Sequence, residues 1–148
     1  MPYQEKQSIV NIFSGLLITA IFAWIIYQRQ ANGLIDLTTD YRQWGIIYLI
    51  FIGVSIVARI VIYIIFHIFN AIATREMDIP VTDERDRLIR LKATRNAYFA
   101  FSVGFVPIFL LLALGTPVYW IFIVFAIGGL VSEIVENISQ IYYYRKGV

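Results

Sequence analysis

The sequence predicts an all-α integral membrane protein, a four-helix bundle with both termini cytoplasmic. Of its 148 residues, 59% are hydrophobic and only 15% are charged, and the mean hydropathy of +0.73 lies outside the usual range of soluble domains. Four long apolar stretches indicate four spans, because about 20 helical residues cross a bilayer core of about 30 Å. An uneven distribution of basic residues indicates the orientation of these spans.

All four spans belong to one predicted membrane domain, residues 1–148. Their expected positions are about 8–27, 44–70, 96–115 and 117–138. The first apolar run is longer than the core of a signal peptide, which has about 7–15 residues, and only Lys6 precedes it. We therefore expect this run to be retained as a span.

Two features of the third span predict how it packs. Pro107 lacks a backbone N–H, which leaves the carbonyl of Val103 without its helical partner and predicts a bend there. Gly104 on this span and Gly128 on the fourth predict a close approach, since small residues let helices pack tightly in lipid. A short turn around Gly115 joins the two spans, so we expect antiparallel neighbours.

Basic residues gather on one side of the predicted bundle. With four spans, the N-terminus, the segment between the second and third spans, and the C-terminus all share that side. It holds nine basic residues: Lys6, Arg75, Arg85, Arg87, Arg90, Lys92, Arg95, Arg145 and Lys146. The opposite side holds Arg29 and Arg42. The positive-inside tendency therefore predicts that both termini lie in the cytoplasm.

A connector helix is predicted at about residues 82–95, between the second and third spans. Thr82 or Asp83 can cap its start, and the acidic residues that follow favour the positive end of the helix dipole. Charges spaced i, i+4 are expected to pair on its surface. These pairs are Asp83 with Arg87 and Asp86 with Arg90. The helix is expected to continue into the third span without a break.

The basic residues of the connector have two interpretations. They are ordinary membrane-proximal residues that contact anionic lipid, or they form part of a helix that docks a cytoplasmic protein. The residues concerned are Arg85, Arg87, Arg90, Lys92 and Arg95. Nucleic acid is not expected as a partner, because acidic residues alternate with the basic ones and no aromatic stacking platform accompanies them.

The connector also carries a family resemblance. The 16 residues DERDRLIRLKATRNAY, from Asp83 to Tyr98, resemble the cytoplasmic signature of an uncharacterised family of small four-span prokaryotic membrane proteins, a domain of unknown function. The resemblance implies a prokaryotic plasma membrane and neighbouring helix-turn-helix regulators. It implies no activity and no catalytic residues, and neither Arg59 nor Glu133 belongs to the matching motif.

An arginine inside the second span needs an explanation. A charge at the centre of a membrane helix costs about 2.5–3.5 kcal/mol even on insertion scales. Arg59 follows Trp44 by 15 residues and Glu133 follows Pro117 by 16, on spans that run in the same direction. At a rise of about 1.5 Å per residue, both charges lie about 22–24 Å from the outer interface. We therefore expect a buried ion pair between Arg59 and Glu133.

Polar residues accompany both charges. At 100° per residue, His67 shares a face with Arg59, and Glu136 and Asn137 share a face with Glu133. The predicted buried polar site therefore consists of these five residues. Three interpretations stay open: Arg59 snorkels to the inner headgroups, the pair only fixes helix packing, or the site serves a proton, an ion or an anionic ligand. A metal site at His67, Glu133 and Glu136 is a weaker alternative, and our prediction includes no metal.

No enzyme motif is present, since the chain has no P-loop, no His-Glu-x-x-His and no Gly-x-Ser-x-Gly. We expect neither catalytic residues nor a cofactor. With no cysteine, disulfides and thiolate sites are excluded. The leading hypothesis is a non-catalytic binding or regulatory module that acts through its connector. The alternative is an oligomeric transporter or channel that uses the Arg59–Glu133 level, which requires a homodimer because four spans leave little room for a cavity.

Overall fold

The computed structural model describes residues 3–74 and 83–147, and the described residues form helices and loops without strands. The helices are α1 (Tyr3–Ala31), α2 (Tyr41–Thr74), α3 (Glu84–Val103), α4 (Phe105–Ala113) and α5 (Tyr119–Lys146). Helices α3 and α4 follow one another as a single span, so four helical stretches are long and apolar enough to cross a membrane. The predicted fold class, an all-α membrane protein with four spans, is confirmed.

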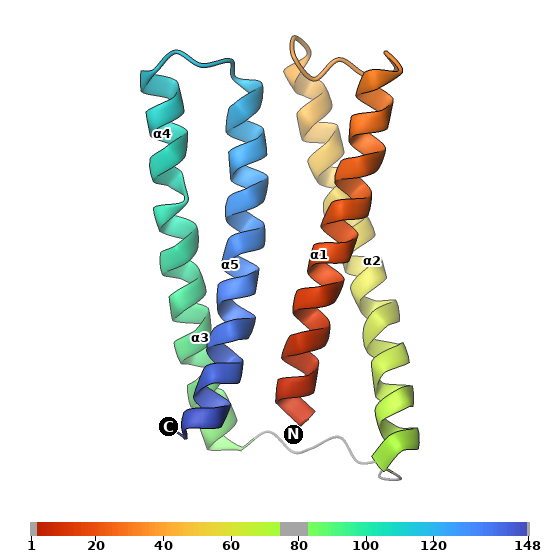
Figure 1. Ribbon diagram of the computed structural model, residues 1–148, viewed down its shortest axis with the longest axis vertical. Helices are drawn as coiled ribbons and strands as arrows, with labels where there is room; N and C mark the ends of the chain where they lie inside the picture. The colour runs from red at the N-terminus through yellow and green to blue at the C-terminus, as the bar shows by residue number, and fades with distance from the viewer. Residues whose placement is uncertain (1–2, 75–82, 148) are drawn as a thin grey trace.

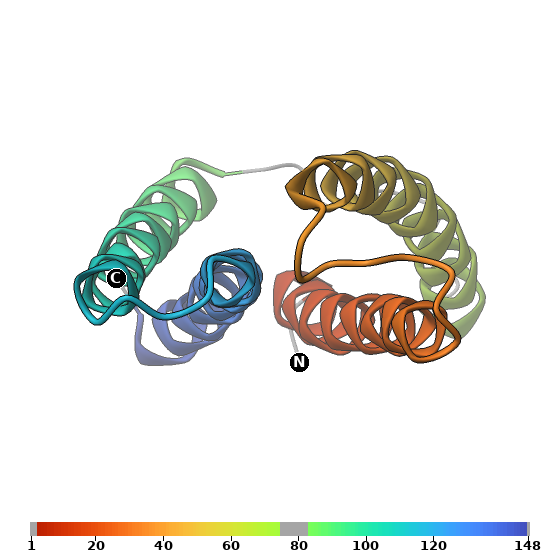
Figure 2. The same ribbon diagram turned by 90° about the horizontal axis from the view of Figure 1, so that it is seen from above.

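The helices form a curved row with α5 near its centre. Helix α5 packs against α3 and α4 on one side and against α1 on the other, and α1 in turn packs against α2. Figure 1 shows α1 beginning and α5 ending at the same end of the molecule, which we call the terminal end. The other end, which we call the loop end, holds the α1–α2 loop and the α4–α5 turn. Seen from above, the α3–α4 span lies on one side of α5, and α1 and α2 lie on the other, with the loop end of α2 nearer to α5 than its terminal end (Figure 2).

The helices are longer than the spans that the apolar runs predicted. Helix α1 begins five residues before Ser8, and α5 continues to Lys146 rather than ending near 138. Helices of 28–33 residues are about 42–50 Å long, whereas the hydrocarbon core is about 30 Å thick. Turns are added at both ends of the molecule, and those at the terminal end carry polar side chains that bond between helices.

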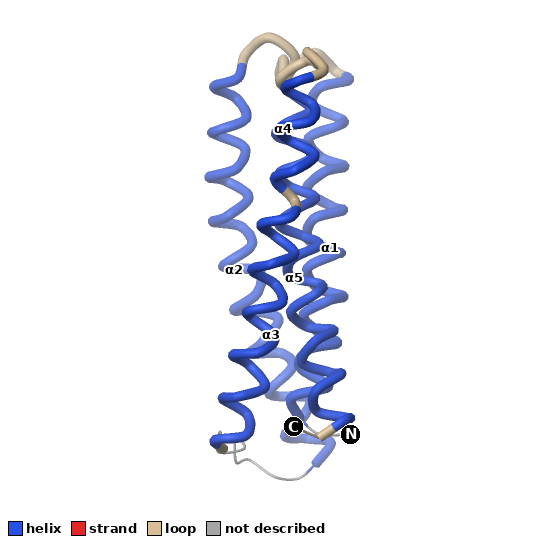
Figure 3. The backbone as a smooth tube through the Cα atoms, turned by 90° about the vertical axis from the view of Figure 1, so that its left-hand side faces the viewer, coloured by secondary structure: helices blue, strands red, loops and turns tan. Residues whose placement is uncertain are grey.

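The third span is interrupted at Gly104, next to the position where Pro107 predicts a bend. Helix α3 ends at Val103 and α4 begins at Phe105, so the interruption falls at the carbonyl that Pro107 cannot bond. Figure 3 shows this interruption as a short loop between α3 and α4. A Cβ on Gly104 would lie 3.7 Å from the Cα of Gly128 on α5. The predicted close approach of these glycines is therefore confirmed.

The best-buried residues lie toward the terminal end. Ile89 and Ala93 of α3 are fully buried, and the neighbouring Ala97 is 6% exposed. On α1 and α5, Ser8 and Asn137 are buried as well. Because α3, α5 and α1 meet here, the predicted connector is part of the packed structure and is not an independent overhang.

Aromatic residues join α2 to α5 near the loop end. Trp44 stacks on Phe122 with ring centroids 5.2 Å apart, and its indole N–H donates to the carbonyl of Leu37 at 2.9 Å. The hydroxyl of Tyr48 donates to the carbonyl of Phe122 at 2.5 Å. These contacts hold one end of α2 against α5. Residues at equal distances from this contact along the two helices therefore lie at the same depth.

Candidate functional site

The structure places Arg59 and Glu133 in direct contact. A guanidinium nitrogen of Arg59, in the middle of α2, lies 2.5 Å from Oε1 of Glu133 on α5. The Arg59 side chain is 33% exposed and that of Glu133 is 25% exposed. The two charges are thus at the same depth, as their distances from Trp44 and Pro117 predict. Within one chain the pair is half-buried, so its protein environment is open on one side.

A glycine on α1 makes room for the carboxylate. A Cβ added to Gly15 would lie 2.7 Å from Oε1 of Glu133 and 3.2 Å from its Cδ. A side chain here would require the flexible end of the Glu133 side chain to shift, because contacts under 3.0 Å are too close. Gly15 was not among the residues predicted for the site. The signal in the sequence is a glycine within the first apolar run, at a depth similar to that of the two charges.

Asn137 extends the site along the α1–α5 interface. Its amide nitrogen donates to the backbone carbonyl of Glu133 at 2.9 Å, and its amide oxygen accepts from Asn11 of α1 at 3.1 Å. One turn further toward the terminal end, the hydroxyl of Ser8 donates to Gln140 at 3.1 Å. These bonds form a polar seam that satisfies amide groups away from water.

Two members of the predicted site lie elsewhere. Glu136 accepts a hydrogen bond from the hydroxyl of Thr94 on α3 at 2.8 Å. Glu136 and Asn137 follow Glu133 by three and four residues, so their side chains point about 100° apart around α5. Glu136 therefore faces α3, whereas Asn137 faces α1. His67 lies about 12 Å along α2 from Arg59, where the hydroxyl of Tyr3 lies 2.9 Å from its Nδ1.

The alternative metal site is not assembled. Among residues 3–74 and 83–147, no three His, Cys, Asp or Glu side chains gather as a metal site would require. Glu133, Glu136 and His67 instead contact α2, α3 and α1 respectively. The predicted five-residue site is therefore reduced to Arg59, Glu133 and Asn137, with Gly15 added.

The connector helix begins as its caps predict, but its charges pair differently. Asp83 caps α3 through its carboxylate, which accepts from the N–H of Glu84 at 2.7 Å, and Asp86 completes a capping box. Thr82, the other candidate cap, lies outside the described residues. The i, i+4 pairs of Asp83 and Asp86 with arginines are not formed. Asp86 instead accepts from Tyr144 at 2.8 Å and from Gln4 at 3.3 Å.

Most basic residues of the connector are left unpaired. Ion pairs within the described part of the chain are Arg59–Glu133 and Arg145–Glu5, the latter at 3.5 Å. Lys92 lies over the ring of Tyr143, 5.7 Å from its centroid. The exposed arginines of the connector that lack an acidic partner among the described residues are Arg85, Arg87, Arg90 and Arg95.

The fold and these contacts define the class of the protein: a small all-α membrane protein with four spans, an ion pair within the spans and a basic helix packed at the terminal end. No family model, no curated protein and no solved structure matches the chain.

Proposed function

We propose that this protein is a non-catalytic docking module, whose connector helix binds an acidic, partly apolar segment of a cytoplasmic protein. The supporting observation is that α3 is anchored on one face and uncovered on the other. Ile89 and Ala93 hold the anchored face, together with the hydrogen bonds of Asp86 to α1 and α5. A helix anchored in this way presents its opposite face rigidly, which lowers the entropy cost of binding.

The uncovered face combines arginines with leucines. At 100° per residue, Arg87, Leu91 and Arg95 lie opposite Ile89 and Ala93. Leu91 is 69% exposed, and neither arginine has an acidic partner among the described residues. Arginine pairs bidentately with carboxylates, and exposed leucines add apolar area, so the complementary partner carries acidic and apolar residues.

The proposed orientation puts the terminal end in the cytoplasm of a prokaryotic plasma membrane. The support is the charge distribution, since the connector arginines and Arg145 share this end whereas Arg29 and Arg42 lie near the other. The same arginines also lie where anionic lipid headgroups meet the protein. Lipid is therefore the competing ligand that an experiment must separate from a protein partner.

Photo-cross-linking from the uncovered face tests the proposal. A photoreactive amino acid at Leu88, which is 52% exposed, should capture a protein with an acidic segment in cells. Arg87→Glu with Arg95→Glu should abolish this capture, and reversing the charges of the partner's segment should restore it. Arg42→Glu, at the loop end, is the control and should change nothing. Capture of lipid alone, or capture that ignores the charge reversal, contradicts the proposal.

A second candidate is an oligomeric transporter or channel in which two copies meet over the ion pair. Two observations favour it: the Arg59 and Glu133 side chains are 33% and 25% exposed, and the hydroxyl of Ser55, one turn from Arg59, is buried without a hydrogen-bond partner among residues 3–74 and 83–147. A homodimer that covers α2 would enclose this level of the membrane.

Ion flux separates the two candidates. If the pair conducts, liposomes containing the protein should show a proton or anion flux that Arg59→Leu with Glu133→Leu eliminates in folded protein. Absence of flux in the unmodified dimer rejects this candidate and leaves the docking module unaffected.

A further inference from the structure

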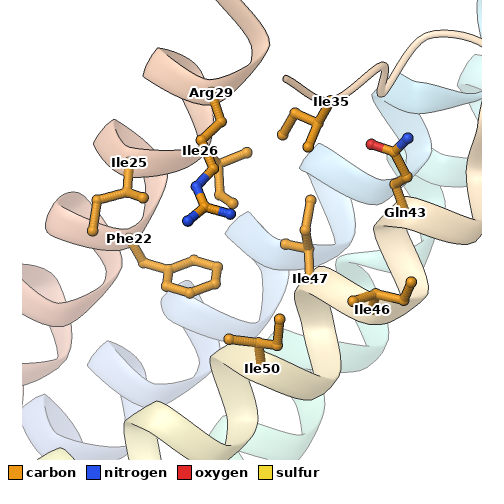
Figure 4. A pocket seen from close by; sticks show the side chains of 9 residues that line it. All are labelled: Phe22, Ile25, Ile26, Arg29, Ile35, Gln43, Ile46, Ile47 and Ile50. Carbon is orange, nitrogen blue, oxygen red and sulfur yellow. The ribbon is translucent and has the colours of Figure 1, made fainter. Parts of the chain in front are cut away.

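An apolar pocket lies between α1 and α2 near the loop end. It is a pocket of about 320 Å³, which is at the lower end of the range of about 300–1,000 Å³ for small-molecule sites. Its walls are the side chains of Phe22 and Ile26 from α1 and Ile46, Ile47 and Ile50 from α2 (Figure 4). Phe22 also contacts Phe51, with ring centroids 4.9 Å apart, which joins the two helices beside the pocket.

One cation lines this apolar pocket. Figure 4 shows the Arg29 side chain reaching from α1 toward the pocket, with its guanidinium near Phe22 and Ile26. No hydrogen bond or ion pair engages this guanidinium within residues 3–74 and 83–147. Arg29 lies two residues before α1 ends at Ala31, which is the headgroup level for a helix whose apolar run spans the bilayer. A guanidinium carries five donors that match a phosphate or carboxylate.

The α1–α2 loop closes the pocket at the loop end of the molecule. Ile35 of this loop is a lining residue, and the carboxylate of the adjacent Asp36 accepts from the hydroxyls of Thr38 and Thr39. These hydrogen bonds hold the pKa of Asp36 well below its ordinary range, so the carboxylate stays charged and keeps the turn formed. Gln43, another lining residue, accepts from the N–H of Asp36 at 3.0 Å.

We infer that this pocket binds an anionic phospholipid, with an acyl chain between α1 and α2 and the phosphate on Arg29. The apolar walls suit an acyl chain, and the unpaired guanidinium at headgroup level supplies the complementary charge. Protein donors already occupy both carboxylate oxygens of Asp36, so this neighbouring acid does not take the place of the phosphate. The site is independent of the connector and of the Arg59–Glu133 pair.

Native mass spectrometry of the detergent-purified full chain tests the inference. Phosphatidylglycerol and phosphatidylcholine with identical acyl chains serve as probes. We expect one tightly retained phosphatidylglycerol, with an affinity about tenfold above that of phosphatidylcholine. Both headgroups carry the phosphate, but the choline cation of phosphatidylcholine neutralises it and repels the Arg29 guanidinium. Arg29→Gln should remove this preference. Arg42→Gln is the matched control, since it neutralises another exposed arginine at the loop end that does not line the pocket.

A filled pocket distinguishes the site from general lipid contact. Ile47→Trp should abolish retention of both lipids, with the helical content by circular dichroism checked in parallel. If this variant loses helical content, the comparison of Arg29→Gln with Arg42→Gln tests the inference instead. Equal affinity of the unmodified chain for the two lipids overturns the inference. So do equal losses in Arg29→Gln and Arg42→Gln, or full retention in a folded Ile47→Trp variant.

Discussion

At the residue scale, the depth of Arg59 in the membrane could be predicted from its position in the sequence. A charge in hydrocarbon requires a partner, and counting residues from the interfacial Trp44 and Pro117 places Glu133 at the same level. The structure brings these side chains together at 2.5 Å. Helical periodicity shows which residues share a face of one helix but not which neighbouring helix that face meets. Glu136 and His67 are therefore predicted in the same site, although they bond to Thr94 and Tyr3.

The ion pair predicts a coupled effect on stability. Arg59→Leu and Glu133→Leu should each destabilise the protein by about 3 kcal/mol, the lower end of the range for buried pairs, because neither side chain is fully enclosed. The double variant should recover about 2 kcal/mol of the summed loss, since it leaves no unpaired charge. Unfolding by sodium dodecyl sulfate in mixed micelles measures this cycle. Additive single costs would show that the two charges do not interact in the membrane.

Replacing glycine by alanine should have opposite effects on stability at Gly15 and at Gly53. Gly15→Ala should destabilise by about 1–3 kcal/mol, because its methyl group would displace the Glu133 carboxylate from Arg59. Gly53→Ala is the matched control, since that helical glycine has nothing within 4 Å of its added Cβ. It should be neutral or stabilising by up to about 1 kcal/mol. The same unfolding assay compares them, and equal shifts would mean that α1 does not pack on the pair.

At the element scale, the sequence was informative about where helices are and less so about what fixes them. Apolar runs and caps located the spans and the start of α3 near Asp83, because these are local signals. The partners of Asp86 could not be predicted, since Gln4 and Tyr144 are far from it in the chain. The predicted Asp86–Arg90 pair at i, i+4 would contribute only about 0.2–0.5 kcal/mol. Asp86 instead bonds to side chains of the helices that pack against α3.

Asp86 should therefore control the connector helix. Asp86→Ala removes the capping box and the hydrogen bonds from α1 and α5, so we expect it to destabilise residues 84–95 by about 1–3 kcal/mol. Hydrogen exchange in nanodiscs should show about tenfold or faster exchange in this segment. Glu84→Ala is the control, because that exposed side chain makes no such bond among the described residues. Unchanged protection in Asp86→Ala would mean that Ile89 and Ala93 alone anchor the helix.

At the scale of the whole molecule, the number of spans followed from the sequence, but their packing order did not. Helical periodicity shows which face of a span is polar without showing which neighbour it meets. The position of α5 between α1 and the α3–α4 span depends on glycines, on Asn137 and on Asp86, each of which acts across helices. The row leaves the Arg59 and Glu133 side chains 33% and 25% exposed, which connects the packing order to the question of a second copy.

The last prediction concerns the side of the membrane on which each end lies. The terminal end carries the exposed connector arginines and Arg145, so the positive-inside tendency predicts a cytoplasmic location for it. The chain contains no cysteine, and thus Asn32→Cys at the loop end and Arg90→Cys in the connector each introduce one unique thiol. Both native residues are exposed.

A membrane-impermeant maleimide applied to intact bacterial cells should label the Asn32→Cys variant and spare the Arg90→Cys variant. Both should react after the membrane is permeabilised, which shows that each thiol is accessible. Labelling of Arg90→Cys in intact cells would reverse the topology and place the connector outside. Such a result would remove the cytoplasmic partner from the docking proposal. It would leave the phospholipid inference intact, because Arg29 would still lie at headgroup level, in the opposite leaflet.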